Sequence, residues 1–342
     1  MTLSLTPDLN DPNPMSYDRA KNSEQNLVID LVRDAIDRKN LLLAYQPIVH
    51  SKNPTRPAYY EGLIRVMDVN RDIIPAKDFI DVVETMELGR VIDCLALELG
   101  LVALAEEPTL RLAINMSARS IGYPRWMDTL NHGLALDPTI GERLILEITE
   151  SSAMVMPDVV NVFMADLHRR GISFALDDFG AGYTAFRFFR DFQFDIVKID
   201  GQFIRDIHKD PDNQVLTAAL ISIAQQFDMF TVAECVEKKE EMSYLQTAGI
   251  DCLQGYLLGR PETVPSQLVR QKCADPHRDR TNPQGQAGQQ AVGVPKHDQR
   301  SDARPGTHPV PPLPSGLCGS SIPRCSIRLS NRARLMPRMR AA

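Results

Sequence analysis

Short runs rich in β-branched and apolar residues alternate with longer amphipathic stretches over residues 41–259. The eight runs are LLLAYQPIV, AYYEGLIRV, RLAINMS, RLILEITE, ISFALDD, DIVKID, FTVAECV and CLQGYLLG. Helical patterns fill most of the gaps, at 76–105 in two pieces, 126–135, 158–170, 183–190, 213–227 and 238–248. Strands that alternate with helices predict an α/β fold with a mainly parallel sheet, and eight units favour closure into a TIM (β/α)8 barrel.

One connection breaks this alternation. The segment SKNPTRP between the first two runs is too short and too rich in proline for a crossover helix, which parallel neighbours require. We therefore predict a modified TIM barrel in which the first strand is antiparallel. A doubly wound open sheet is the structural alternative.

The two ends of the chain differ in composition from this central part. Residues 1–24 are polar and interrupted by prolines, which predicts a loose leader before a barrel domain at 25–262. Residues 263–342 are rich in Pro, Gly and Arg, which predicts a disordered tail or an extension from a shifted reading frame. The basic end of the tail lacks the interleaved aromatic residues or amphipathic period that would favour nucleic-acid or membrane binding.

Charge and cysteine content narrow the class of protein. Residues 1–265 contain 25 Lys and Arg against 40 Asp and Glu, whereas 266–342 contain 13 against 4. No run of eighteen apolar residues or apolar leader is present, so we expect a cytoplasmic protein without a membrane span. The six cysteines show no CxxC pairing, which favours reduced thiols over a zinc site.

The polar residues at the ends of the predicted strands are unusually acidic. Catalytic groups of such barrels project from strand ends, and a charge within an apolar strand is costly unless it is paired or metal-bound. Each residue alone could equally be a surface charge, a helix cap or half of an ion pair. Together, seven or more carboxylates cannot be neutralised by one lysine, which indicates bound cations. The residues are Glu61, Asn115, Glu147, Glu150, Asp177, Asp178, Lys198, Asp200, Glu234 and Glu237.

Oxygen ligands of this kind favour Mg²⁺ or Mn²⁺, and the near absence of His and Cys among them argues against zinc. The period of two in a strand places Glu61 and Arg65 on one face. Adjacent Asp177 and Asp178 would point in opposite directions along a strand, so both reach one site only where the strand gives way to the loop GAGYTAF. Gly180 and Gly182 are expected to supply the backbone freedom for that turn.

Over 41–261 the chain resembles the cyclic di-GMP phosphodiesterases of the EAL type, a family named for a Glu-Ala-Leu signature. The motifs that carry the resemblance are EGLIR at Glu61, NMS at Asn115, EITE at Glu147, DDFGAGYT at Asp177, KID at Lys198, AECVE at Ala233 and QGYLLGRP at Gln254. The resemblance implies a modified TIM barrel with an antiparallel first strand. It also implies hydrolysis of cyclic di-GMP to linear pGpG with two Mg²⁺ or Mn²⁺ ions per active site, and a homodimer.

The resemblance further implies a role for each residue. One metal would be bound by Glu61, Asn115, Glu147 and Asp177. The second would be bound by Asp177, Asp178 and Glu234, with Asp177 bridging. Lys198 would contact the attacking water, and Glu150 would anchor the glycine loop that joins the metal site to the dimer interface. The residues expected to contact the substrate are Arg65 at a phosphate, Gln46, Leu63 and Gln254 in the nucleotide pocket, and Asp200 and Glu237.

The sequence departs from the family motifs at two positions, and neither departure removes a metal ligand. Gly62 replaces the signature alanine, and it should point away from the face of Glu61 and mainly add backbone freedom. Cys235 replaces the usual glycine of AECVE. Its larger side chain is expected to shift Glu234 slightly, and a small shift of a catalytic group can reduce turnover.

Two other functions stay open at this stage. The chain could be a module that senses cyclic di-GMP without cleaving it, but the complete set of ligand positions counts against this. It could also be a barrel phosphoesterase for another nucleotide, since spacing and charge do not identify guanine. Phe186, Phe188 and Phe189, near the glycine loop, are candidates for a dimer interface or for ordinary core positions.

Overall fold

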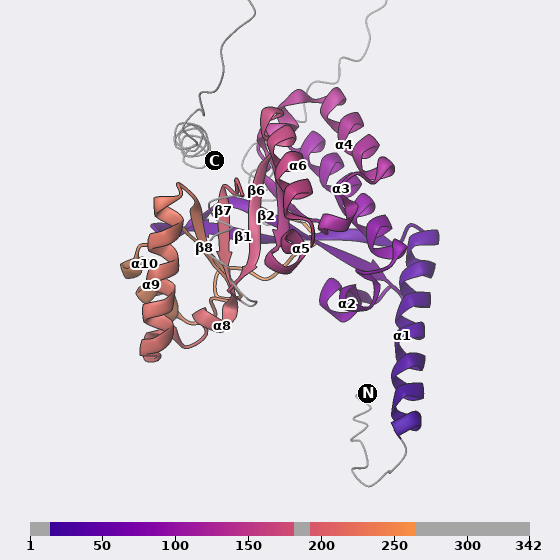
Figure 1. The fold of residues 1–342 in the computed structure, drawn as a ribbon, viewed down its shortest axis with the longest axis horizontal. Coiled ribbons are helices and arrows are strands. Elements are labelled where there is room, and N and C mark those ends of the chain that lie inside the picture. The colour runs from indigo at the N-terminus through magenta and orange to yellow at the C-terminus, as the bar shows by residue number, and fades with distance from the viewer. Residues whose placement is uncertain (1–13, 181–191, 265–342) are drawn as a thin grey trace, which may run out of the picture.

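A computed structural model describes residues 14–180 and 192–264, and eight of its strands close into a barrel surrounded by helices (Figure 1). The strand order is β1-β9-β8-β7-β6-β5-β4-β2, and the pairing of β1 with β2 closes the ring. The predicted barrel is therefore confirmed over the open sheet. The strands are β1 (Leu41–His50), β2 (Asn53–Met67), β4 (Leu112–Asn115), β5 (Leu144–Thr149), β6 (Ser173–Phe179), β7 (Ile196–Ile199), β8 (Phe230–Ala233) and β9 (Cys252–Gln254).

The antiparallel first strand is also confirmed. β1 pairs antiparallel with both β2 and β9, whereas every pairing from β2 through β4 to β9 is parallel. Only Ser51 and Lys52 separate β1 from β2, which leaves room for a hairpin and none for a crossover. A short strand that the pattern did not predict, β3 (Ile73–Pro75), pairs antiparallel with the end of β2, at Arg65–Met67.

The helices agree in position with the amphipathic stretches. Three of them begin with proline at the first helical position, where its missing N–H costs no hydrogen bond. The predicted helix at 183–190 lies outside the described residues. The helices are α2 (Ile80–Val83), α3 (Glu87–Glu106), α4 (Pro124–Leu136), α5 (Glu150–Val155), α6 (Pro157–Arg169), α8 (Gly201–Ile204), α9 (Pro211–Gln226) and α10 (Lys239–Ala248), with 3-10 turns at Ala76–Asp78, Ala118–Ser120, Pro138–Glu142 and Ile207–Lys209.

The N-terminal helix α1 (Pro14–Asp37) starts inside the segment predicted to be a loose leader. Residues 14–24 are therefore helical, although they carry no apolar period. The C-terminal half of α1 is attached to the barrel by buried Val32 and Ala35, and its first turns extend away from the body (Figure 1). Contacts of the later turns thus stabilise a helix whose start the local sequence does not specify. Among the described residues, no helix combines the length and apolar character needed to cross a bilayer.

The core has two parts, which the alternation of each strand explains. Outward residues such as Leu112 and Ile114 pack under the helices in the larger cluster. Inward residues such as Ala113 and Ile145 form a second cluster within the ring of strands. Neighbouring positions of one strand therefore belong to different layers, and polar residues on the inward face must lie above the second cluster.

Candidate functional site

Each of the eight barrel strands supplies one polar residue to the same inward level. On seven strands this residue comes two positions after an inward apolar residue, namely Tyr59, Ala113, Ile145, Ala175, Ile196, Val232 or Cys252. On antiparallel β1 the order is reversed, since Gln46 precedes Ile48. The polar residues are Gln46, Glu61, Asn115, Glu147, Asp177, Lys198, Glu234, which directly follows β8, and Gln254.

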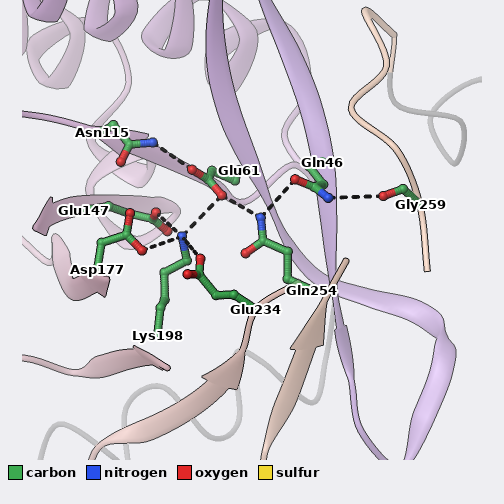
Figure 2. A network of polar contacts seen from close by, with 9 residues as sticks. All are labelled: Gln46, Glu61, Asn115, Glu147, Asp177, Lys198, Glu234, Gln254 and Gly259. Atoms are coloured by element: carbon green, nitrogen blue, oxygen red, sulfur yellow. Dashed lines mark hydrogen bonds and ion pairs between the residues drawn. The ribbon is translucent and has the colours of Figure 1, made fainter. Parts of the chain in front are cut away.

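Lys198 lies at the centre of this ring (Figure 2). Its side chain is 1% exposed, and its Nζ contacts four carboxylates. The distances from Nζ are 2.8 Å to Glu147 Oε2, 2.8 Å to Glu234 Oε1, 2.9 Å to Asp177 Oδ1 and 3.3 Å to Glu61 Oε2. One ammonium group thus faces four carboxylates that come from four different strands or strand ends.

The charge on Lys198 is secured by these neighbours. Burial by itself would lower the pKa of the ammonium group, but attraction by Asp177, Glu147, Glu234 and Glu61 outweighs burial and raises this pKa well above its usual value. The lysine is therefore a permanent cation at neutral pH, and it cannot act as a base there.

The carboxylates carry more negative charge than Lys198 can balance. Burial raises the pKa of Glu147 well above its usual range, and it raises the pKa of Glu234 to about 8, with Asp177 adding repulsion in both cases. For Glu61, burial is outweighed by Lys198 and by hydrogen bonds from Gln254 and Asn115, so its pKa is lowered. A buried group of this composition takes up protons unless further cations neutralise it.

Two clusters in this ring have the geometry to hold cations. Ligand atoms of Glu61, Glu147 and Asp177 lie within 4.8 Å of one another, and so do those of Asp177, Asp178 and Glu234. Glu147 Oε1 is buried and has no hydrogen-bond partner, which is costly for a carboxylate oxygen unless a cation approaches it. Both clusters offer only carboxylates and share Asp177, and oxygen donors of this kind suit Mg²⁺ or Mn²⁺.

The structure brings Asp177 and Asp178 together by a different route from the one expected. Asp178 itself has a left-handed backbone, with φ of 53°, and the pairing of β6 with β7 shifts register between Leu176 and Phe179. Such a bulge lets two adjacent side chains approach the same site. Gly180 also has positive φ, of 96°, but it follows the turn, and Gly182 lies outside the described residues. The positive φ of Gly180 agrees with the backbone freedom expected there, and the left-handed backbone of Asp178 is an addition that the sequence did not predict.

Glu150 contacts the start of the glycine loop. It is the first residue of α5, and its Oε2 accepts a hydrogen bond of 3.2 Å from Gly180 N. The carbonyl of Gly180 is held as well, because Gln202 Nε2 donates to Gly180 O at 3.0 Å. Sequence reasoning missed Gln202, and the only available signal was its place two residues after the KID motif.

Some of the predicted substrate residues join the network and others do not. Gln254 Nε2 donates to Glu61 Oε2 at 2.6 Å and to Gln46 Oε1 at 3.2 Å, and Gln46 Nε2 donates to Gly259 O at 3.2 Å (Figure 2). By contrast, Asp200 accepts from Gln202 N as the cap of α8, and the side chain of Glu237 is exposed.

Arg65 and Leu63 follow Glu61 on β2 at the spacing of two that places them on its face. Arg65 is largely buried, which lowers the pKa of its guanidinium, and its Nη1 donates to Ile64 O at 2.9 Å. Leu63 is partly exposed. Both therefore remain candidates for substrate contact beside the ring.

Cys235 has a strained backbone, which the sequence did not predict. Its φ is 54°, a left-handed conformation that favours glycine. The flanking backbone is held on both sides, because Glu234 N donates to Ile199 O and Val236 N donates to Gln254 O. Glu234 Oε1 still reaches Lys198, so the cysteine does not remove Glu234 from the ring.

Comparison with known proteins shows the family to which the chain belongs. The family model for the EAL domain matches residues 30–261. The chain is 30% identical over 245 residues to the cyclic di-GMP phosphodiesterase PdeF of Escherichia coli (strain K12). The aligned region covers 70% of this chain and 32% of that protein. It is 29% identical over 239 residues to the cyclic di-GMP phosphodiesterase PdeB of Shewanella oneidensis, and this aligned region covers 69% of this chain and 28% of that protein. The chain thus spans about a third of the length of these curated relatives.

Solved structures show the same fold. A PaMucR phosphodiesterase in complex with c-di-GMP matches with a TM-score of 0.61 and 27% identity, covering 71% of this chain and 99% of that chain. The FimX EAL domain from Pseudomonas aeruginosa, bound to c-di-GMP, matches with a TM-score of 0.64 and 23% identity, covering 69% of this chain and 97% of that chain. At 23% identity the second match supports the fold alone.

Proposed function

The chain belongs to the EAL domain family, and from this premise we propose that it is a phosphodiesterase that uses two divalent cations to hydrolyse cyclic di-GMP to linear pGpG. The observation that carries the proposal is the inward ring of residues in which two carboxylate clusters share Asp177. The relatives named as cyclic di-GMP phosphodiesterases support the choice of substrate.

The cations would be held by residues that the barrel already brings together. Glu61, Asn115, Glu147 and Asp177 would bind the first ion, which is Mg²⁺ or Mn²⁺. Asn115 Nδ2 donates to Glu61 Oε1 at 2.8 Å, so its amide oxygen is the atom that would face the ion. Asp177, Asp178 and Glu234 would bind the second ion. When bound, such a pair of ions would polarise the phosphate and lower the pKa of a bound water molecule.

The protein's own residues would orient the reacting groups. Lys198 is held as a cation by its neighbours, so it would donate hydrogen bonds to the attacking water and offset charge on the phosphate. Arg65 would contact a substrate phosphate, and Gln46, Leu63 and Gln254 would contact the nucleotide. Glu150 would fix the glycine loop through Gly180.

We also expect a homodimer. Four apolar residues on α5 and α6 and between them are exposed, and Val162 is 73% exposed. They run from the end of α5, the helix that begins with Glu150, onto the first turns of α6, and exposed apolar residues of this kind are typical of an interface between copies. Phe186, Phe188 and Phe189 lie outside the described residues. The four residues are Val155, Met156, Val159 and Val162. The cytoplasmic location stays a prediction.

One assay tests substrate, cation and catalysis together. Purified protein is incubated with cyclic di-GMP and either Mg²⁺ or Mn²⁺, and the products are separated by chromatography. We expect pGpG, and we expect excess EDTA to abolish its formation. Persistence of hydrolysis in EDTA would refute the role of the cations.

A substitution separates an enzyme from a receptor that only binds cyclic di-GMP. Lys198→Ala should lose turnover while it still binds the nucleotide, whereas a receptor has no turnover to lose. Lys209→Ala is the matched control, since the Lys209 side chain is 71% exposed and lies away from the ring. Absence of hydrolysis by the unmodified protein, together with binding of cyclic di-GMP, would favour the receptor.

A further inference from the structure

Gly62 and Ile114 lie directly opposite each other in the parallel pairing of β2 with β4. Both positions face outward, away from Glu61 and Asn115, which precede and follow them in their strands. A Cβ at position 62 would lie 2.8 Å from Ile114 Cδ1 and 3.3 Å from Leu112 Cδ1. The isoleucine therefore occupies the space that a side chain at position 62 would need.

A second glycine confines the same isoleucine from the other side. A Cβ at Gly100, on α3, would lie 2.8 Å from Ile114 Cδ1 and 2.9 Å from Ile114 Cγ1. Ile114 is 1% exposed, so its side chain fills the gap between the strand and the helix. Gly62 is not among the residues with positive φ. Its value here is therefore space for Ile114 rather than the backbone freedom expected from the sequence.

This contact lies one residue away from two proposed ligands of the first ion, one on each strand. Glu61 precedes Gly62, Asn115 follows Ile114, and Asn115 Nδ2 donates to Glu61 Oε1 at 2.8 Å. A change in the distance between β2 and β4 at this level would therefore change the distance between Glu61 and Asn115, the two proposed ligands of the same ion. Cores transmit such changes because they are close-packed.

We propose that Ile114 is a positioning residue for the first cation site, and that its Cδ1 atom lies closer to position 62 than the alanine of the family signature would allow. The inference rests on the proposed function, since it takes this site to hold a cation. It explains why glycine replaces the signature alanine at position 62: the side chain of Ile114 on the neighbouring strand needs the space. Glycine at 62 and isoleucine at 114 are thus a matched pair.

The test is a set of substitutions that add and remove the atoms named above. Gly62→Ala adds the Cβ, and Ile114→Val removes Cδ1, the atom that this Cβ would meet. The double variant should therefore relieve the clash. Gly100→Ala is the matched control, because it presses on Ile114 from the helix side and also meets Cγ1, which valine retains.

The main measurement is the dissociation constant for Mn²⁺ by calorimetry, without substrate. Gly62→Ala should bind Mn²⁺ about tenfold more weakly, a loss typical of residues that orient metal ligands, and the double variant should recover nearly all of it. Gly100→Ala presses on Ile114 from α3 and not from the paired strand, so it should lower the unfolding temperature in EDTA, without rescue by Ile114→Val, and should weaken Mn²⁺ binding less than Gly62→Ala does. In kinetics, Gly62→Ala should lower kcat with little change in KM.

Three outcomes would overturn the inference alone while leaving Mn²⁺ binding by the unmodified protein intact. They are unchanged Mn²⁺ affinity in Gly62→Ala, no recovery in the double variant, or a loss in Gly100→Ala as large as in Gly62→Ala. If Gly62→Ala does not fold, the double variant decides, since its folding with normal affinity supports the inference and its failure to fold refutes it. An unmodified protein that binds no Mn²⁺ would refute the proposed function and this inference with it.

Discussion

Lys198 Nζ lies 2.8 Å from Glu147 Oε2, and the two side chains are 1% and 0% exposed. An ion pair this deeply buried is worth little compared with apolar residues, but removal of one partner leaves an uncompensated charge. Here the lysine also faces three further carboxylates. Its position therefore makes it the main counter-charge of the ring when no other cation is present.

Replacement of Lys198 by methionine should destabilise the protein in EDTA. We expect a loss of about 3 kcal/mol in the free energy of unfolding at pH 8, in the range for a broken buried pair. Saturating Mn²⁺ should restore most of this loss, because the ions bind only the folded state. Urea unfolding with and without Mn²⁺ measures both effects, with Lys209→Met as the exposed control. Equal stability of Lys198→Met and the unmodified protein in EDTA would contradict this account.

Asp93 should make the stability of the protein depend on pH. It lies on α3, accepts hydrogen bonds from Ser117 N at 3.0 Å and Ser120 Oγ at 2.5 Å, and is buried. Burial raises its pKa to about 7, the two hydrogen bonds oppose the rise, and Glu84 adds to it. The folded state thus holds a proton that the unfolded state has lost above pH 4. Stability from this proton is present below pH 4 and is lost as the pH rises to about 7.

The comparison with Asp93→Asn isolates this effect, because asparagine cannot ionise. Relative to Asp93→Asn, the unmodified protein should lose a few kcal/mol, at most about 4, between pH 4 and pH 7. Chemical unfolding at a series of pH values gives this difference directly. Parallel curves for the two proteins would show that Asp93 does not hold its proton in the folded state.

Much of the barrel could be predicted because the period of two appears directly in the sequence. Glu147 comes two residues after Ile145, and Lys198 two residues after Ile196, so their common face follows from alternation alone. The eight-strand ring and its acidic residues could therefore be predicted from the sequence. Lys198 was the only basic residue among them, but its central place and its four contacts depend on distances across the barrel.

Three features could not be predicted from the sequence, because they depend on backbone conformation or on contacts between residues that are distant in the chain. Nothing in the letters DDFG shows that Asp178 adopts positive φ as well as Gly180, since aspartate does so only where its surroundings hold it there. The start of α1 at Pro14 has no local apolar period to mark it. The role of Gly62 depends on Ile114, which is 52 positions away in the chain and adjacent in the sheet.

Gly201 should tolerate no side chain while Cys235 is present. A Cβ at Gly201 would lie 2.6 Å from Cys235 Sγ and 2.7 Å from Cys235 Cβ. Gly201→Ala should therefore cost about 1–3 kcal/mol of stability, as overpacking does. Cys235→Gly removes both atoms and should rescue Gly201→Ala, whereas Cys235→Ala keeps the Cβ and should rescue it only in part.

Thermal unfolding of the three single and two double variants, measured in EDTA, checks this pair. Mn²⁺ affinity is a second measurement, because Cys235 follows Glu234 and Gly201 comes three residues after Lys198. If Cys235→Ala rescued Gly201→Ala as well as Cys235→Gly does, the Sγ atom alone would set the contact. If neither rescued it, the segments after β7 and β8 would not be coupled through these two residues.

Gly180 is held on both sides, and the two contacts should differ in importance. Glu150 is 5% exposed and accepts from Gly180 N, whereas Gln202 is exposed and donates to Gly180 O. Removal of the buried partner leaves an N–H without its acceptor beside Asp177 and Asp178, and such a loss costs more than that of an exposed hydrogen bond. Glu150→Ala should therefore lower kcat by about 100-fold, the effect of a displacement near 1 Å in a catalytic group, with little change in KM.

The matched variants are Glu150→Gln, which retains an acceptor oxygen, and Gln202→Ala, which removes only the exposed contact. Glu150→Gln should keep more activity than Glu150→Ala, and Gln202→Ala should reduce kcat by less than about fivefold, as expected for a neutral exposed hydrogen bond. Steady-state kinetics with cyclic di-GMP, together with unfolding temperatures, separate a shift of the loop from a loss of folding. A larger effect on kcat from Gln202→Ala than from Glu150→Ala would show that the carbonyl of Gly180, and not its N–H, controls the position of the loop.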